Sequence, residues 1–319
     1  MQARRLGRSG IEVSALGLGC WAIGGPAWKQ GRPVGWGKID DAESVRAIKH
    51  AIDIGVTLFD TADIYGCGHS ERILGRAISG QRDKVVIATK FGKMFDEHSK
   101  QALEWNASGK YIHQACEASL KRLNSDYIDL YQFHLDTDEN TLEVRDTMEE
   151  LVAEGKIRCY GWSTDNPGQA KIFAKGRYCA AIQQSLNIFG GNLKTLGVCE
   201  EFNLASINCS PLAKGILTGK FTENSALPAD DLRSSWDFKN GRPAEMLRQL
   251  SAIRDIITSN GRSCAQGALC WLWALSKKTI PIPGFKTVEQ VEENAAAMEF
   301  GPFTQKQMKQ IDELLKKKG

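Results

Sequence analysis

Several apolar runs of this chain end on polar residues that could take part in acid–base chemistry. VTLFD, VVIATK and IDLYQFH end at Asp60, Lys90 and His134, and Tyr65 follows the first run in the turn ADIYG. The runs IRCYGWS, AAIQ, ASINCS and KTIPIPG lead in the same way to Ser163, Gln183, Ser210, Gly284 and Lys286. Continuous Val- and Ile-rich runs are typical of parallel strands buried on both faces. In a parallel barrel all strands point the same way, so these residues would meet on one face.

The side chains of four of these residues predict a proton-transfer site: Asp60, Tyr65, Lys90 and His134. A buried ammonium is costly unless it is paired, so Lys90 at the end of an apolar strand needs an anion, and Asp60 is the nearest candidate. The pair would hold a positive charge beside the Tyr65 hydroxyl and lower its pKa from the usual value of about 10 toward neutrality. His134 would donate a hydrogen bond to a carbonyl oxygen. Each residue alone has an ordinary structural explanation, but the four together favour acid–base chemistry on a small molecule.

The elements that must position these residues alternate along the chain. Helical patterns are expected near residues 40–53 and 69–79, at 112–123 and 142–152, from Asn166-Pro167 onward, and at 193–198 and 288–298. With LGLGC at 16–20 as the first strand there are eight strands, which predicts a (β/α)8 barrel. We also expect an N-terminal β-hairpin around GRSG that plugs the bottom of the barrel, an extra C-terminal helix, and a long insertion at 220–243 over the active face.

The composition limits the class of protein. The chain has 319 residues, with 42% hydrophobic and 25% charged residues, as in soluble globular proteins. We expect residues 1–319 to form a single domain, because α/β barrels exceed the usual domain length. The 41 basic and 38 acidic residues are spread along the chain, which argues against nucleic-acid and membrane partners. The short basic tip LLKKKG is expected to be a solvated helix end.

Nine cysteines form no CxxC pair, and most lie in apolar runs (Cys159, Cys179, Cys209 and Cys270), which indicates buried thiols in a reducing compartment. MQARRLGRSG lacks the apolar core of a signal peptide, and no stretch is long enough to span a bilayer, so we expect a cytoplasmic location. The five histidines show no metal-ligand spacing, and no metal is expected.

Other motifs are assigned by their context. No GxGxxG follows a strand, and GILTGKF fails as a P-loop because Gly215 and Gly219 are too close and Phe221 replaces the Ser or Thr. The Gly-rich first loop is expected to offer its tryptophans, Trp21, Trp28 and Trp36, to a substrate. Trp271 and Trp273 lie in a helical apolar run and are expected to pack in the core.

Six segments in order resemble the aldo-keto reductase family. FDTADIYG, VVIATKFG and DYIDLYQFH are similar to its catalytic motifs, and LGRSGIEVSALGLGCW, SPLAKGILTGK and IPIPGFKTVEQVEEN also match, so the resemblance covers nearly the whole chain. It implies a (β/α)8 barrel and NAD(P)(H)-dependent reduction of aldehydes and ketones, or the reverse oxidation. Tyr65 would give the proton, Lys90 and Asp60 would tune Tyr65, and His134 would orient the substrate, which Trp21 would also contact.

The resemblance also implies a set of cofactor contacts. Ser163 and Gln183 would bind the nicotinamide carboxamide, Ser210, Leu212 and Gly215 the pyrophosphate, and Lys286, Gln290, Glu293 and Asn294 the adenosine, with Trp21, Asp60 and Gly284 completing the set. A helix N-terminus after the last strand suits a phosphate, and Lys286 favours NADP(H), with NAD(H) as the alternative. Two positions depart from the family pattern: Thr164 replaces an Asn, and Cys209 replaces the aromatic residue that stacks on the nicotinamide.

Three functions remain open. The favoured one is an NADP(H)-dependent carbonyl reductase. The second is a sugar or polyol dehydrogenase that works in the oxidative direction. The third is a non-enzymatic NADP-binding regulatory subunit, against which the complete set Asp60, Tyr65, Lys90 and His134 argues.

Overall fold

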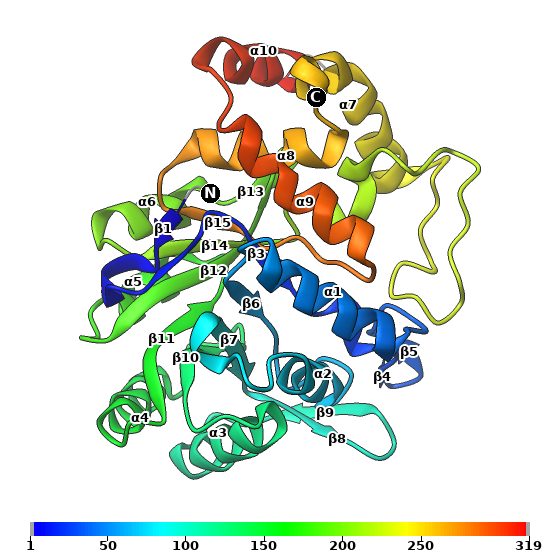
Figure 1. Cartoon of the computed structure of the whole chain (residues 1–319). Coiled ribbons are helices and arrows are strands. Elements are labelled where there is room, and N and C mark those ends of the chain that lie inside the picture. The colour runs from blue at the N-terminus through cyan, green and yellow to red at the C-terminus, as the bar shows by residue number, and fades with distance from the viewer. Residues whose placement is uncertain (1–2, 317–319) are drawn as a thin grey trace.

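Eight parallel strands form the centre of the computed structural model, which describes residues 3–316 (Figure 1). In sheet order they are β3 (Gly17–Gly19), β6 (Leu58–Asp60), β7 (Val86–Phe91), β10 (Ile128–Phe133), β11 (Ile157–Ser163), β12 (Cys179–Asn187), β14 (Ala205–Cys209) and β15 (Thr279–Pro281). The first and last strands also meet, because the Gly19 amide donates to the Pro283 carbonyl at 2.9 Å and Gly19 bridges Gly284. The predicted (β/α)8 barrel is confirmed.

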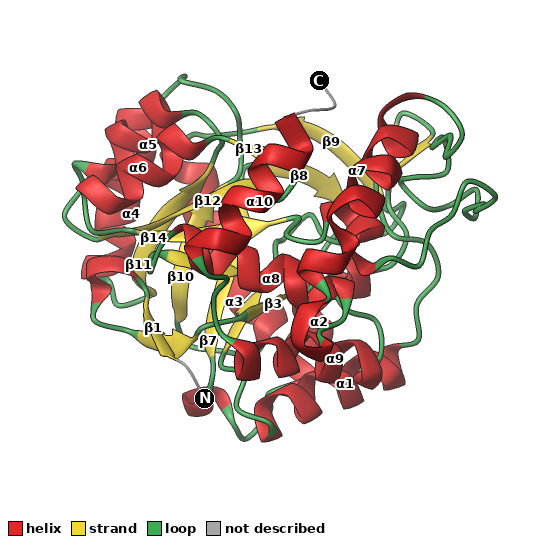
Figure 2. Ribbon diagram, turned by 90° about the horizontal axis from the view of Figure 1, so that it is seen from above, coloured by secondary structure: helices red, strands yellow, loops and turns green. Residues whose placement is uncertain are grey.

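Helices surround the strands, as both views show (Figures 1 and 2). They are α1 (Asp41–Asp53), α2 (His69–Ala77), α3 (Gly109–Leu123), α4 (Thr141–Ala153), α5 (Pro167–Ala174), α6 (Leu193–Glu201), α8 (Cys264–Leu275) and α9 (Val288–Phe300). Two more helices lie outside the repeat: α7 (Gly241–Ile257) and, as expected, the C-terminal α10 (Gln305–Lys316), which packs on α7 and α8. Residues 317–319 of the expected basic tip lie outside the described residues. In the described part of the chain, no helix combines the length and apolar character needed to cross a membrane.

The N-terminal hairpin closes one end of the barrel. Strands β1 (Ala3–Arg5) and β2 (Glu12–Ser14) pair antiparallel around the short 3-10 helix η1 (Gly7–Ser9). Leu6, Ile11 and Val13 pack in the cluster of side chains that fills the barrel interior. A Cβ atom on Gly7 would lie 2.1 Å from the Ala180 carbonyl oxygen, so only glycine permits this approach. The predicted plug is therefore present.

Arg8 fastens this plug to the barrel wall. Its guanidinium donates to the carbonyls of Cys179 at 2.7 Å, Ala174 at 2.8 Å and Gly176 at 2.5 Å. We expect Arg8→Ala to lower the free energy of unfolding by about 2 kcal/mol, because these bonds are charge-assisted. The control is Arg5→Ala, since the 4.0 Å pair of Arg5 with Glu12 is exposed and should contribute little. Urea unfolding of both variants measures the difference, and equal losses would contradict the role of Arg8.

Local signals explain where the helices begin. The Asp40 carboxylate accepts hydrogen bonds from the amides of Ala42 and Glu43 at 2.8 and 3.1 Å and caps α1. The Asn166 side chain caps α5, whose first residue is Pro167. The two helices begin where the sequence predicts, near residue 40 and at Asn166-Pro167.

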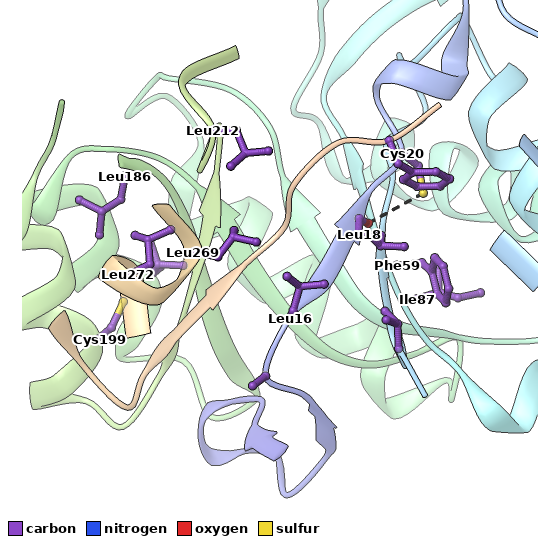
Figure 3. Close-up of a cluster of buried hydrophobic side chains, with 14 of the residues drawn as sticks. Leu16, Leu18, Cys20, Phe59, Ile87, Leu186, Cys199, Leu212, Leu269 and Leu272 are labelled. Carbon is purple, nitrogen blue, oxygen red and sulfur yellow. Dashed lines mark hydrogen bonds between the residues drawn. The ribbon is translucent and has the colours of Figure 1, made fainter. Parts of the chain in front are cut away.

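The hydrophobic core lies between the barrel and the helices. Figure 3 shows Leu18, Cys20 and Phe59 close together, and the Cys20 thiol lies 3.9 Å from the Leu18 carbonyl oxygen. Trp271 and Trp273 are both buried, and the Trp273 indole donates to the Ala15 carbonyl at 2.9 Å. Their predicted packing role is confirmed. Eight of the nine cysteines are buried, whereas Cys209 is half-buried.

Three details differ from the sequence expectations. Leu142 and Leu193, predicted on apolar helix faces, are 59% and 58% exposed in the first turns of α4 and α6. Strand β12 continues to Asn187, so Gln183 lies inside the strand and not at its end. A second sheet was not predicted; its strands are β5 (Arg32–Pro33), β4 (Trp28–Lys29), β9 (Gln101–Trp105) and β8 (Lys93–Asp96), in that order. Their two- to five-residue length leaves little periodic signal in the sequence.

Candidate active site

A cavity of about 500 Å³ opens among the C-terminal ends of the barrel strands and the loops that follow them. Of the predicted site residues, those that line it are Trp21, Asp60, Tyr65, His134, Ser163, Gln183, Ser210, Leu212, Gly215, Gly284, Lys286, Gln290, Glu293 and Asn294. The predicted residue that does not line it, Lys90, lies directly behind Asp60 and Tyr65. These residues therefore meet on one face of the barrel, as expected for residues at the ends of parallel strands.

Lys90 forms the predicted ion pair with Asp60. Its fully buried ammonium donates to the Asp60 carboxylate at 2.6 Å, the Thr61 carbonyl at 2.7 Å and the Tyr65 hydroxyl at 3.1 Å. Burial alone would lower the pKa of Lys90, but Asp60 and Tyr65 together raise it. Lys90 is therefore a fixed cation that touches the Tyr65 oxygen.

Two amides hold the other oxygen of Asp60. The side-chain nitrogens of Gln183 and Gln132 donate to it at 2.7 and 3.2 Å. Both glutamines are buried, so they fix the carboxylate while Lys90 takes its second oxygen. Gln132 was not predicted from the sequence, although its position two residues before His134 in the run IDLYQFH was an available signal.

The predicted net lowering of the Tyr65 pKa is wrong for this structure. Burial of the phenol raises the pKa of Tyr65 to about 12 and outweighs Lys90, which lowers it, while Asp60 raises it further. The negative charge of Asp60 also offsets part of the effect of the Lys90 cation on Tyr65. Tyr65 therefore holds its proton at neutral pH, the state of a proton donor.

His134 faces Tyr65 across the cavity. The two rings meet edge to face with centroids 6.2 Å apart, and Trp21 stacks on Tyr65 with a centroid distance of 5.6 Å. Burial, and then the charges of Lys93 and Lys90, hold the pKa of His134 well below its usual range. The imidazole is therefore neutral and suited to donate a hydrogen bond rather than a proton.

Two of the three tryptophans from the first loop reach the cavity. Trp21 and Trp36 line it and contact each other edge to face at 5.5 Å. Trp28 does not line it, because it lies on β4 and pairs with Pro33 and Gln101 in the second sheet. Its predicted contact with the substrate is wrong.

The two residues that depart from the family pattern, Thr164 and Cys209, have different surroundings. Thr164 is buried, its hydroxyl donates to the Gln169 side chain and it accepts a 3.0 Å bond from the Asn166 amide, so it serves the start of α5. Cys209 does line the cavity, and burial raises the pKa of its thiol to about 12. A neutral thiol therefore occupies this wall, beside Ser163 and Gln183.

The loop after β14 has an unusual backbone. Ser210, Ala213, Lys214 and Gly215 all adopt positive φ angles of 51°, 47°, 52° and 98°. Left-handed conformations of non-glycine residues are strained, and such strain concentrates at functional sites. The loop, which includes the 3-10 helix η4 (Ala213–Thr218), forms one wall of the cavity through Ser210, Leu212 and Gly215.

Four cations gather at the far end of the cavity: Lys214, Lys220, Arg233 and Lys286. Sequence reasoning identified only Lys286, whose ammonium donates to the Trp36 carbonyl at 2.6 Å. Arg233 bonds both oxygens of buried Asp231 at 2.9 and 2.7 Å and donates to the Lys214 carbonyl at 2.8 Å. Lys214 lies in the loop after β14, but its closeness to the other cations depends on the unusual backbone of that loop. Lys220 and Arg233 belong to the irregular insertion and fit no strand or helix pattern.

The long insertion carries Lys220 and Arg233 over the site and is the loop at the right of Figure 1, beside β4 and β5. Its Asp231 bridges Trp36, the Leu232 amide donates to the Gly35 carbonyl at 2.9 Å, and the Arg233 guanidinium lies 4.5 Å from the centre of the Trp36 ring. The insertion thus covers the active face as predicted. Residues 3–316 contain no cluster of three or more His, Cys, Asp or Glu side chains placed to hold a metal ion.

Known proteins are similar to this chain in sequence and in fold. The model of the Aldo/keto reductase family matches residues 15–316. The aldo-keto reductase YhdN of Bacillus subtilis is 34% identical over 309 residues, which cover 92% of this chain and 87% of that protein. The structure of a glycerol dehydrogenase from Gluconobacter oxydans is 31% identical with a TM-score of 0.84, covering 98% of this chain and 94% of the other.

A third relative was solved with a nucleotide. It is an aldo-keto reductase from Klebsiella pneumoniae in complex with NADPH, 28% identical with a TM-score of 0.73, covering 99% of this chain and 96% of the other. The family model matches nearly the whole chain, and the fold agrees with those of the solved relatives. This chain is a member of the aldo-keto reductase family of oxidoreductases.

Proposed function

We propose that this protein is an NADP(H)-dependent oxidoreductase that reduces aldehydes and ketones to alcohols, with Tyr65 as the proton donor. The observation that carries the proposal is the 3.1 Å contact between the buried Lys90 ammonium and the Tyr65 hydroxyl, at the wall of a cavity large enough for a small molecule. The NADPH complex of the Klebsiella pneumoniae relative supports the choice of cofactor.

The residues present fit a nicotinamide nucleotide. The cations Lys214, Lys220, Arg233 and Lys286 would hold its phosphates, since ammonium and guanidinium groups are strong phosphate donors. Ser163 and Gln183 would hold the carboxamide, and Asp60 fixes the Gln183 nitrogen so that its amide oxygen is left to accept an N–H. When bound, the nucleotide supplies the hydride for the carbonyl carbon.

The residues of this chain supply the proton and the orientation. Tyr65 keeps its proton because burial raises its pKa, and it gives that proton to the carbonyl oxygen as negative charge develops there. Lys90 stabilises the resulting phenolate from 3.1 Å, and Asp60 holds Lys90 in place. His134 would orient the carbonyl by a hydrogen bond.

A second function has specific support. The Gluconobacter oxydans relative is a glycerol dehydrogenase, so oxidation of a polyol is the alternative. In that direction Tyr65 would act as a base and would have to lose its proton first. Since burial raises the pKa of Tyr65 to about 12, oxidation should become faster as the pH rises, whereas reduction needs no deprotonation.

The test of the function is a panel of aldehydes, ketones, sugars and polyols with NADPH, NADH and their oxidised forms, followed by cofactor absorbance. We expect NADPH oxidation with aldehydes to have the highest kcat/KM at neutral pH. NADPH binding without turnover on any member of the panel would favour the regulatory subunit. A higher kcat/KM for polyol oxidation would favour the dehydrogenase.

Lys286→Ala should reduce the affinity for NADPH far more than that for NADH. Lys286 lies beside the N-terminus of α9, where the Gln290 side chain accepts from the Lys286 amide at 2.7 Å, and we propose that its ammonium binds the 2′-phosphate. A charge-assisted contact is worth about 1.5–3 kcal/mol, or roughly ten- to a hundredfold in affinity. Fluorescence titration of both cofactors measures the effect.

The control for this prediction is Lys38→Ala, which removes an exposed cation that does not line the cavity although its backbone carbonyl lies 3.4 Å from the Lys286 ammonium. It should leave both affinities nearly unchanged. If Lys286→Ala weakened NADPH and NADH equally, Lys286 would not bind the 2′-phosphate. If the wild type preferred NADH, the assignment of NADP(H) would be wrong.

A further inference from the structure

Lys93 points its ammonium group at the histidine of the site. Its nitrogen lies 3.4 Å from Nε2 of His134, although Lys93 belongs to β8 in the second sheet and not to the barrel. The residue as a whole is exposed, and partial burial of its ammonium group followed by the charge of Lys90 lowers its pKa. The mechanism proposed above does not use this cation.

The charges around Lys93 leave it without a carboxylate partner. Lys90 and Lys29 repel it, and Asp63 attracts it from a distance. Within residues 3–316, no carboxylate forms an ion pair with Lys93, and its close polar contact is the neutral imidazole. The 3.4 Å separation is at the long limit for a hydrogen bond, so this contact is weak and easily exchanged.

While Lys93 makes this contact, His134 has the tautomer that cannot donate from Nε2 to a carbonyl. An ammonium only donates, so Nε2 must accept and the ring proton must sit on Nδ1. That nitrogen is buried and has no hydrogen-bond partner among the described residues. For Nε2 to donate to a substrate, Lys93 must leave it and the ring proton must move from Nδ1 to Nε2.

We propose that Lys93 binds a carboxylate on the substrate, so that the enzyme prefers small carbonyl compounds that also carry a carboxylate. The inference rests on the proposed carbonyl reductase activity and names its substrate class. The carboxylate would accept from Lys93 and draw the ammonium away from Nε2. His134 would then present an Nε2 proton to the carbonyl oxygen of the same molecule.

Lys93 does not line the cavity itself, but it contacts His134, which does. The cavity walls near His134 suit such a substrate. Asp60, which lines the cavity beside Tyr65, is fully engaged by Lys90, Gln183 and Gln132 and would repel an anion little. The other acidic residue among the cavity walls, Glu293, belongs to the opposite end with Lys286 and Gln290. Trp21, stacked on Tyr65, offers an apolar surface for the carbon skeleton.

The experiment compares acids with their neutral esters. The kcat/KM values for 2-, 3- and 4-carboxybenzaldehyde are measured against those for the three corresponding methyl esters, on wild type and variants with NADPH. For at least one isomer, kcat/KM for the acid should be about ten times that for its ester in the wild type. This factor is near the lower limit for a charge-assisted hydrogen bond. Lys93→Met should reduce that ratio to about one, and Lys93→Arg should restore part of it.

Lys29→Met is the matched control, because Lys29 is an exposed cation on β4 whose charge also acts on Lys93, whereas the contact with Nε2 of His134 is made by Lys93. It should keep the wild-type ratio. A wild-type ratio near one for all isomers, a ratio that survives in Lys93→Met, or one lost equally in Lys29→Met would each overturn the inference. Failure to reduce either acids or esters would instead contradict the proposed carbonyl reductase activity.

Discussion

Tyr65→Phe is expected to lower kcat for carbonyl reduction by about 10²–10⁴, the usual contribution of a positioned general acid. The substitution removes the hydroxyl that Lys90 contacts at 3.1 Å and keeps the ring that stacks on Trp21. The fold and the affinity for NADPH should therefore be retained. The measurement is steady-state turnover together with an NADPH titration by fluorescence.

Tyr131→Phe provides the matched control. Tyr131 is also fully buried in the barrel, but its hydroxyl has no hydrogen-bond partner within the described part of the chain. Loss of that hydroxyl should change kcat little. Near wild-type turnover in Tyr65→Phe, or an equal loss in both variants, would contradict the role of Tyr65.

Lys90→Met should be similarly damaging, by about 10²-fold or more in kcat, and should also change the pH dependence. Lys90 lowers the pKa of Tyr65 against the larger opposing effect of burial, so its removal raises that pKa further. Alcohol oxidation needs the phenolate, and its rate should therefore begin to rise at a higher pH than in the wild type. Rates of oxidation measured across alkaline pH test this direction.

The Lys90→Met variant leaves the buried Asp60 carboxylate without its cation, which could destabilise the fold by itself. The double variant Asp60→Asn with Lys90→Met removes both charges and separates the two effects. Because Lys90 lowers the pKa of Tyr65 more than Asp60 raises it, the double variant should shift the pH profile in the same direction as Lys90→Met but by less. If Lys90→Met is stably folded and its pH profile equals that of the wild type, Lys90 serves only packing. A shift toward lower pH would contradict the electrostatic argument.

The barrel could be predicted from the sequence because its strands are buried on both faces. Such strands read as uninterrupted apolar runs, and the polar residue that ends each run marks the active face. Asp60, Lys90 and His134 were placed in this way, and Tyr65 by the turn that follows Asp60. The caps at Asp40 and Asn166 likewise need only local sequence.

The remaining features depend on three-dimensional distances that no sequence period encodes. The pKa of Tyr65 depends on how far burial outweighs one neighbouring cation, and the sequence shows the cation but not the burial. Arg233 reaches the cavity from an irregular insertion that is held by Trp36. Lys93 reaches His134 from a short strand outside the barrel, 41 residues away in the chain.

Transfer of deuterium to an aldehyde from NADPH that carries deuterium at both hydrogen positions of nicotinamide C4 is the most direct test of the central claim. The account predicts that the alcohol formed by the wild type carries one deuterium on the former carbonyl carbon, as detected by mass spectrometry, and that Tyr65→Phe forms the same labelled product much more slowly. An unlabelled alcohol, or no alcohol although NADPH binds, would contradict the account.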